Sequence, residues 1–137
     1  IMKNNKTLDE IFFSVIIPTY NRSYELEILL KTFQKQIYKK FEIIIVDDGS
    51  QEEIFPLVKK FSGLNIKYYK IKNSERGTAR NYGYLKSSGM YLNFFDSDDL
   101  ALKNHLNEAY KLIIKKNFPD LYHFSYQINN FKNKKIS

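Results

Sequence analysis

The sequence predicts an α/β protein in which a mostly parallel sheet is flanked by helices. Three observations predict it: strand-like and helix-like segments alternate along the chain, no long linker or internal repeat interrupts them, and one strand carries a continuous apolar run. That strand is Phe41–Val46, which contains three consecutive isoleucines. Apolar residues on both faces of a strand are typical of a parallel sheet covered by helices.

The size and composition of the chain fit one globular domain. Its 137 residues are enough for a sizeable core, and the 43% hydrophobic and 27% charged residues are ordinary values for a folded protein. No apolar run approaches the roughly 20 residues that span a bilayer, and we see no signal-peptide pattern. Cysteine is absent, which excludes disulfides and thiolate chemistry and fits a reducing compartment.

The first elements follow a polar, lysine-rich N-terminal segment, residues 1–11, which we expect to be flexible. Phe12–Ile17 is rich in β-branched and aromatic residues and predicts a strand that Pro18 ends. Tyr24–Gln36 has apolar residues at a helical period, with Ser23 as the expected N-cap.

The middle of the chain alternates in the same way after Phe41–Val46. Glu52–Phe61 predicts a modest helix that contains Pro56. Ile66–Ile71 predicts a third strand, and Arg76–Ser87 predicts a helix. Gly89 is expected to end that helix in a left-handed conformation.

The last elements complete the predicted domain, residues 12–128. Tyr91–Phe95 predicts a buried fourth strand, Ala101–Lys116 an amphipathic helix, and Leu121–Ile128 a fifth strand. Residues 129–137 are polar and basic, and we interpret them as a tail or as the start of a further half of the protein.

Turn-rich polar clusters follow three of the predicted strands. They are Pro18–Arg22, Asp47–Ser50 and Asp96–Asp99. Ligands of such sheets bind outside the carboxyl ends of the strands, so we expect the three clusters to meet at one edge. The alternative for the third cluster is that its serine and aspartates only cap the next helix. Helix capping would account for the third cluster alone, whereas a shared ligand site accounts for all three, so we favour the ligand site.

The three carboxylates of Asp96, Asp98 and Asp99 repel one another unless a cation offsets their charge. Hard cations with oxygen ligands suit this spacing, so we expect Asp96 and Asp98 to bind Mn²⁺ or Mg²⁺.

An acid and three arginines lie in or beside the same clusters. Asp48, next to Gly49, could accept hydrogen bonds from the base or the ribose of a nucleotide, although a simple turn is the alternative. The chain contains three arginines, Arg22, Arg76 and Arg80, and their planar guanidinium groups favour phosphate or carboxylate recognition. The alternative is that these arginines bind no ligand and are solvated residues at the start of a helix. Together the parts suit a metal-bound nucleotide diphosphate.

Other classes of site have little support. The chain has no GxxxxGK[ST] phosphate loop and no GxGxxG motif. His105 and His123 fall inside predicted elements, and we interpret both as structural or surface residues. The net charge is +7, but the lysines are scattered, so nucleic-acid binding is not expected and contact with an anionic membrane stays open.

Four motifs in order make the chain similar to a known family. They are SVIIPTYNR (Ser14–Arg22), IIIVDDGS (Ile43–Ser50), ERGTARNYGY (Glu75–Tyr84) and FFDSDD (Phe94–Asp99). The chain closely resembles the nucleotide-binding half of family 2 glycosyltransferases from about Phe12 to Ile128. The resemblance implies a GT-A fold, a Rossmann-like, mostly parallel sheet, here truncated after the fifth strand.

The resemblance also implies roles for individual residues. The residues that would hold uridine or another nucleoside are Pro18, Thr19, Tyr20 and Asp48. Arg76 and Arg80 would lie near the nucleotide-sugar. Asp96 and Asp98 would contact the ribose and a diphosphate-bound Mn²⁺ or Mg²⁺, and Asp99 could contribute. The implied enzyme inverts the anomeric carbon of a nucleotide-sugar, with a UDP-sugar favoured, and transfers the sugar to a saccharide or lipid-linked acceptor.

The resemblance leaves two alternatives open. The catalytic base of the family is expected downstream of the chain end, so a non-catalytic nucleotide-sugar-binding module is one alternative. A metal-dependent nucleotidyltransferase or phosphatase is the other. We expect a cytoplasmic protein, with the inner face of the cell membrane as an open location. Half a fold would expose apolar surface, so a homo-oligomer is a further expectation.

Overall fold

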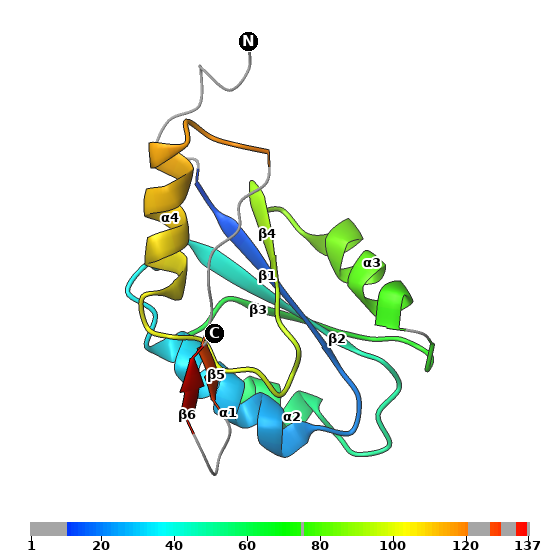
Figure 1. The fold of residues 1–137 in the computed structure, drawn as a ribbon. Coiled ribbons are helices and arrows are strands. Elements are labelled where there is room, and N and C mark those ends of the chain that lie inside the picture. The colour runs from blue at the N-terminus through cyan, green and yellow to red at the C-terminus, as the bar shows by residue number, and fades with distance from the viewer. Residues whose placement is uncertain (1–10, 75, 121–126, 130–133, 137) are drawn as a thin grey trace.

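The structure is a computed structural model that describes residues 11–74, 76–120, 127–129 and 134–136 (Figure 1). Its centre is a four-stranded sheet in the order β3-β2-β1-β4, and all three strand pairs are parallel. The strands are β1 (Phe13–Thr19), β2 (Phe41–Asp47), β3 (Ile66–Lys70) and β4 (Tyr91–Phe94). The helices are α1 (Ser23–Gln34), α2 (Phe55–Lys59), α3 (Arg76–Lys86) and α4 (His105–Lys115). The predicted α/β class with a parallel sheet is confirmed.

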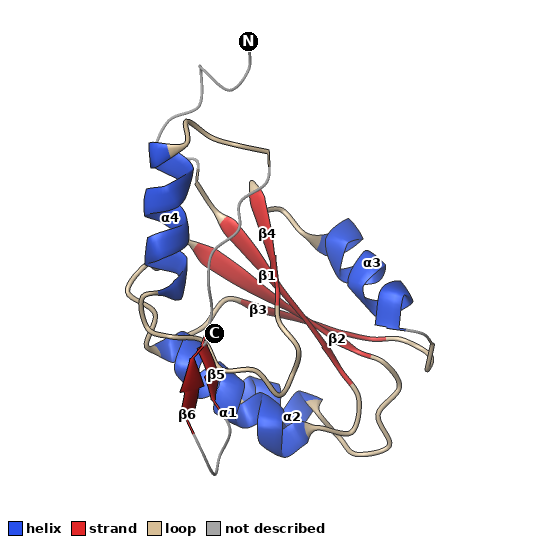
Figure 2. Cartoon of the chain, in the orientation of Figure 1, coloured by secondary structure: helices blue, strands red, loops and turns tan. Residues whose placement is uncertain are grey.

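Helices cover both faces of this sheet (Figure 2). The larger core lies between one face and α1, α2 and α4, and the smaller core lies between the other face and α3. Alternate residues of β2 enter the two cores: Ile43 and Ile45 the first, Ile44 and Val46 the second. Every residue of β2 is buried, as its apolar run predicts.

Pro18 does not end the first strand, because β1 continues to Thr19. The Ile16 carbonyl accepts the Phe95 N–H on the β4 side, whereas the Thr19 carbonyl accepts the Asp48 N–H on the β2 side. The backbone N–H and carbonyl groups of successive residues in a strand point in opposite directions. The backbone nitrogen of Pro18 therefore points to the same side as that of Ile16, toward β4. There β4 has already ended at Phe94, so the missing N–H of proline removes no ladder bond.

The N-termini of two helices differ from the predictions. Ser23 is the first residue of α1 and not its cap. Its backbone N–H and its hydroxyl both donate to the carboxylate of Glu52, at 2.9 Å each, so an acid 29 residues away closes this helix end. The helix predicted over Glu52–Phe61 shortens to α2 because Pro56 is tolerated only in the first turn.

The start of β4 also differs from the prediction. Gly89 is not left-handed; among the described glycines only Gly49 has a positive φ. A Cβ on Gly89 would lie 2.6 Å from the backbone nitrogen of Ser14, so glycine is required there by the close approach to β1. The strand is only partly buried, and Phe94 is 49% exposed, because β4 is at the edge of the sheet.

The amphipathic helix predicted over Ala101–Lys116 begins only at His105. The Ala101 N–H donates to the Thr32 hydroxyl, which keeps this residue in the connecting loop. Gln36, fully buried, holds the loop and the helix together: its amide donates to the Leu102 carbonyl at 2.6 Å and its carbonyl accepts the Leu106 N–H at 3.1 Å.

The predicted fifth strand does not belong to the main sheet in its described part. Residues 121–126 lie outside the described residues, and β5 (Gln127–Asn129) pairs antiparallel with β6 (Lys134–Ile136). No helix in the described part of the chain is long and apolar enough to cross a membrane.

Candidate functional site

A cleft of about 380 Å³ lies at the carboxyl ends of the parallel strands. It is lined by the following residues: Pro18, Thr19, Tyr20, Arg22, Asp48, Asn73, Ser74, Ala79, Arg80, Asp96, Ser97 and Asp98. All the side chains that the sequence predicts for the site line this cleft, except that of Arg76, which lies outside the described part of the structure. The three predicted clusters therefore meet at one edge.

The loops after β1 and β2 are locked together. Asn21 has a left-handed backbone with φ of 50°. Its N–H donates to the Ser50 hydroxyl at 2.9 Å, and its side-chain carbonyl accepts the Gln51 N–H at 2.8 Å. Asparagine tolerates this conformation better than most residues because its short polar side chain bonds locally. The lock fixes the flanking Tyr20 and Arg22, which are exposed at the cleft.

Thr19 sits at the floor of the cleft with an unsatisfied hydroxyl. Its Oγ1 is buried and has no hydrogen-bond partner among the described residues. A buried polar group without a partner costs about 1–3 kcal/mol, which a ligand's polar atom at this position would recover.

The two acids after β2 have different environments. Asp47 is fully buried, and its carboxylate accepts the Ser50 N–H at 2.9 Å and the Tyr68 hydroxyl at 2.5 Å. Burial and the bond to Asp47 raise the pKa of Tyr68 well above its usual value, so the phenol stays a donor. Both carboxylate oxygens of Asp47 are therefore occupied by hydrogen bonds within the protein, whereas Asp48 lines the cleft.

Asp48 is held from the connection between β3 and α3. The Ser74 N–H and hydroxyl both donate to Asp48 Oδ1, at 2.8 and 3.0 Å. The Asn73 side chain donates to the Asp48 carbonyl at 2.9 Å. Gly49 has a φ of +83°, and a Cβ there would lie 2.7 Å from the Asn73 nitrogen, so only glycine fits this close contact.

The acidic cluster consists of Asp96, Asp98 and Asp99. All three side chains are exposed, and one oxygen from each lies within 4.8 Å of the others. Partial burial and the negative charges of Asp96 and Asp98 raise the pKa of Asp99, although the Asp96 N–H, which donates to its carboxylate, opposes this shift. An all-oxygen set with mutual repulsion fits a hard divalent cation.

The acids do not cap the following helix. They form a turn in which the Asp99 N–H donates to the Asp96 carbonyl at 3.0 Å. The next helix, α4, begins at His105, and its N-cap residue is Asn104. The alternative interpretation of these residues as helix caps is wrong.

Two arginines flank the acidic cluster. Arg80 Nη2 lies 2.7 Å from Asp96 Oδ1, and Arg22 Nη1 lies 3.5 Å from Asp98 Oδ2. Both guanidinium groups are partly exposed and line the cleft. Positive and negative groups thus alternate around its mouth, an arrangement that can hold an anion together with a cation.

Three cleft residues were not predicted from the sequence: Asn73, Ser74 and Ala79. Ser97 also lines the cleft and lies inside the predicted cluster Asp96–Asp99, although the sequence assigned it no ligand. Asn73 and Ser74 follow β3 just as the other clusters follow their strands, so the same rule about carboxyl ends could have identified them.

His105 has the structural environment expected for it. Its ring packs edge-on against Phe95, with centroids 5.0 Å apart, and Nε2 is 3.1 Å from Asn93 Oδ1. Burial lowers its pKa to about 4. His123 lies outside the described residues.

Comparison with known proteins finds similar sequences and similar solved structures. The chain is 41% identical over 115 residues to an uncharacterized glycosyltransferase of Rickettsia bellii, a match that covers 83% of this chain and 16% of the relative. It is 30% identical over 128 residues to the Escherichia coli UDP-Glc:alpha-D-GlcNAc-diphosphoundecaprenol beta-1,3-glucosyltransferase WfgD, covering 90% of this chain and 49% of the relative. The crystal structure of S. aureus TarS 1-349 in complex with UDP superposes with a TM-score of 0.72 at 34% identity, over 76% of this chain and 32% of that one.

The chain thus spans less than half of the length of each of these relatives. Its sheet and flanking helices match the GT-A-like structures of solved glycosyltransferases. Residues 14–136 match the sequence model of Glycosyl transferase family 2. The chain belongs to that family.

Proposed function

We propose that this chain binds the nucleotide-sugar donor, a UDP-sugar, of a metal-dependent and inverting glycosyltransferase. The observation that carries the proposal is the cleft itself, which is lined by Asp48, two arginines and two of the three clustered carboxylates. The names of the relatives support a uridine nucleotide, since TarS was crystallised with UDP and WfgD is a UDP-Glc transferase. WfgD also supports a lipid-linked or saccharide acceptor.

The nucleoside would occupy the part of the cleft between the loops after β1 and β2. Asp48 has one carboxylate oxygen without a partner among the described residues, and it would accept a hydrogen bond from the base. The Thr19 hydroxyl would gain the partner that it lacks. Pro18 and Tyr20 line the same part of the cleft and would flank the nucleoside.

The diphosphate would lie between the arginines and the acidic cluster. Asp96 and Asp98, with Asp99 beside them, would hold Mn²⁺ or Mg²⁺. A bound divalent cation neutralises a diphosphate and makes it a better leaving group. Arg22 and Arg80 would bind phosphate oxygens through their planar forks, and the arrangement would orient the anomeric carbon toward the acceptor. We assign no catalytic base within the chain.

The proposal is tested by calorimetric titration of UDP and GDP into the protein, with Mn²⁺ and again with a chelator. We expect UDP to bind only when Mn²⁺ is present. Absence of binding by either nucleotide under both conditions would refute the donor-binding role. Release of pyrophosphate or phosphate from a nucleotide-sugar, in place of UDP, would favour the nucleotidyltransferase or phosphatase alternative. Membrane contact, self-association and a cytoplasmic location stay predictions from the sequence.

A further inference from the structure

We infer that Ser74 is a specificity-determining positioning residue, which makes Asp48 select a base with a single N–H donor, such as uracil, over guanine. The inference rests on the proposed function. Ser74 lies in the connection between β3 and α3, outside the four motifs on which the family resemblance was based. It acts through Asp48, whose carboxylate it holds.

The hydrogen bonds of Asp48 leave only one of its oxygens available. A carboxylate oxygen offers about two lone-pair sites, and Oδ1 receives two donors from Ser74, the N–H at 2.8 Å and the hydroxyl at 3.0 Å. Oδ2 has no hydrogen-bond partner among the described residues. Asp48 is 8% exposed and lines the cleft, so this single oxygen is what it offers to a ligand.

The backbone of Asp48 is fixed from two sides. Its N–H donates to the Thr19 carbonyl at 2.8 Å, and its carbonyl accepts the Asn73 side-chain amide at 2.9 Å. Gly49 packs against the Asn73 backbone directly after it. These contacts fix the backbone of Asp48 relative to Ser74, so the carboxylate could present both oxygens to a ligand only by breaking the two hydrogen bonds that Ser74 donates to Oδ1.

The pairing edges of the bases differ in the number of adjacent N–H donors. Uracil has one N–H between two carbonyls, so one carboxylate oxygen satisfies it. Guanine has a ring N–H beside an exocyclic amine, and these two donors suit the two oxygens of a free carboxylate. With Oδ1 saturated by Ser74, the second guanine donor stays unpaired inside the cleft. An unpaired donor there lowers the affinity by roughly tenfold or more.

The test compares the affinities for UDP and GDP, both with Mn²⁺, by calorimetry. We expect the wild-type protein to prefer UDP by about tenfold or more. Ser74→Ala frees one lone pair of Oδ1, so GDP should bind more tightly and the UDP preference should fall by roughly tenfold. Ser74→Thr keeps the hydroxyl and should keep the preference. Asn73→Ala is the matched control, because Asn73 bonds the Asp48 backbone and not its carboxylate. It should weaken both nucleotides alike and leave their ratio unchanged.

Other results overturn the inference and can be told apart. An unchanged ratio in Ser74→Ala, or equal weakening of both nucleotides, makes Ser74 a purely structural residue while the proposed function stands. A wild-type preference for GDP also overturns the inference alone. If the wild-type protein binds neither nucleotide, the proposed function fails and the inference fails with it. Ser74 is exposed, and thermal unfolding of each variant checks that the fold is kept.

Discussion

Arg80 of α3 and Asp96, two residues after β4, form an ion pair in which Nη2 and Oδ1 are 2.7 Å apart. The two side chains are 35% and 50% exposed. An ion pair this open to solvent contributes about 0–1 kcal/mol to folding. Its position at the mouth of the cleft indicates that the pair serves the ligand site more than the stability of the fold.

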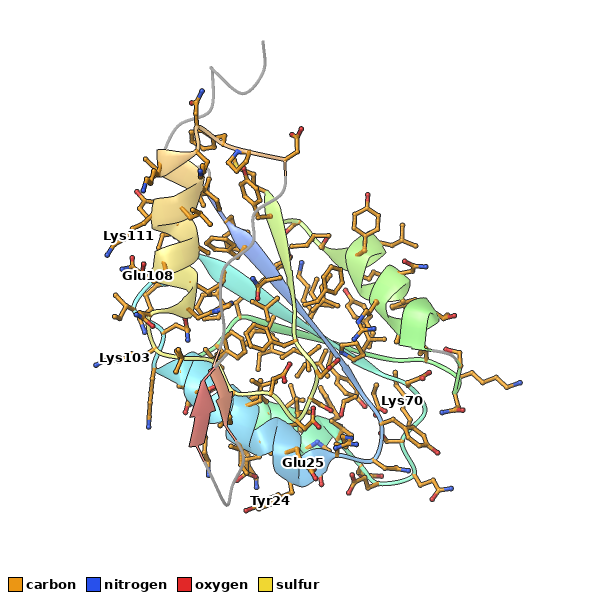
Figure 3. All side chains as sticks on the ribbon, in the orientation of Figure 1. Tyr24, Glu25, Lys70, Lys103, Glu108 and Lys111 are labelled. Carbon is orange, nitrogen blue, oxygen red and sulfur yellow. The ribbon has the colours of Figure 1, made fainter. Side chains whose placement is uncertain are left out.

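The substitution Arg80→Gln should therefore separate binding from stability. We expect the free energy of unfolding to change by less than about 1 kcal/mol. The affinity for UDP with Mn²⁺ should fall about 10- to 100-fold, because charge-assisted hydrogen bonds to phosphate are lost. Denaturant unfolding and calorimetry measure the two quantities. Lys111→Gln is the control, since Lys111 is also in an exposed ion pair, on α4 (Figure 3), and does not line the cleft. Equal losses of affinity in both variants would contradict the role of Arg80.

The acidic cluster gives a second prediction. Asp98→Asn should abolish the Mn²⁺ dependence of UDP binding and lower the affinity at least about tenfold, because a neutral amide is a weaker ligand for a hard cation. Calorimetry with and without a chelator measures both effects. Glu108→Gln is a matched control: the Glu108 and Asp98 side chains are each 53% exposed, and Glu108 lies on α4. Unaltered Mn²⁺-dependent binding in Asp98→Asn would remove this residue from the metal site.

Two glycines of α3 should respond oppositely to the same substitution. A Cβ on Gly83 would lie 2.5 Å from Ile16 Cγ2 in the core between α3 and the sheet. Gly83→Ala should therefore destabilise the protein by about 1–3 kcal/mol. A Cβ on Gly77 meets no atom within 4 Å, so Gly77→Ala should stabilise the helix by up to about 1 kcal/mol. Denaturant unfolding decides, and changes of equal sign would contradict the close packing at Gly83.

The burial of His105 predicts a pH dependence of stability. Its pKa is about 4 in the folded state, against 6.5 in the unfolded chain, so between these values only the unfolded chain takes up the proton. The free energy of unfolding is therefore highest above pH 6.5, where His105 is neutral in both states. It decreases as the pH falls toward 4, by up to about 3 kcal/mol.

The substitution His105→Gln tests this pH dependence. The variant should lose less stability than the wild-type protein over this range, because glutamine keeps a donor for Asn93 but does not titrate. Denaturant unfolding at several pH values gives the two curves. Parallel curves would show that the imidazole titrates normally. NMR titration of the His105 resonance, identified by its loss in the variant, measures the pKa directly.

The helix and strand order, the parallel sheet and most of the cleft could be predicted from local patterns. The apolar run of β2 indicated burial on both faces, and the acids and arginines fell next to strand ends. This worked because side-chain periodicity is a local property, and because the carboxyl ends of parallel strands must lie at the same edge.

Two of the errors share one physical cause. Ser23 looked like a helix cap, but Glu52 bonds it from 29 residues away. Gly89 looked like a left-handed stop, but the approach of β1 at Ser14 requires it. In both places a partner distant in the sequence replaced the local interaction that the pattern indicated.

The sequence by itself determined which residues are candidates for binding a nucleotide, since their chemical types and positions after strands are written in it. Only the tertiary structure decided how each of them is used. In the folded protein the Asp47 carboxylate accepts hydrogen bonds from Tyr68 and Ser50, and one oxygen of Asp48 accepts hydrogen bonds from Ser74. These assignments depend on which loops the fold brings within hydrogen-bonding distance, and that distance is set by the packing of the whole sheet.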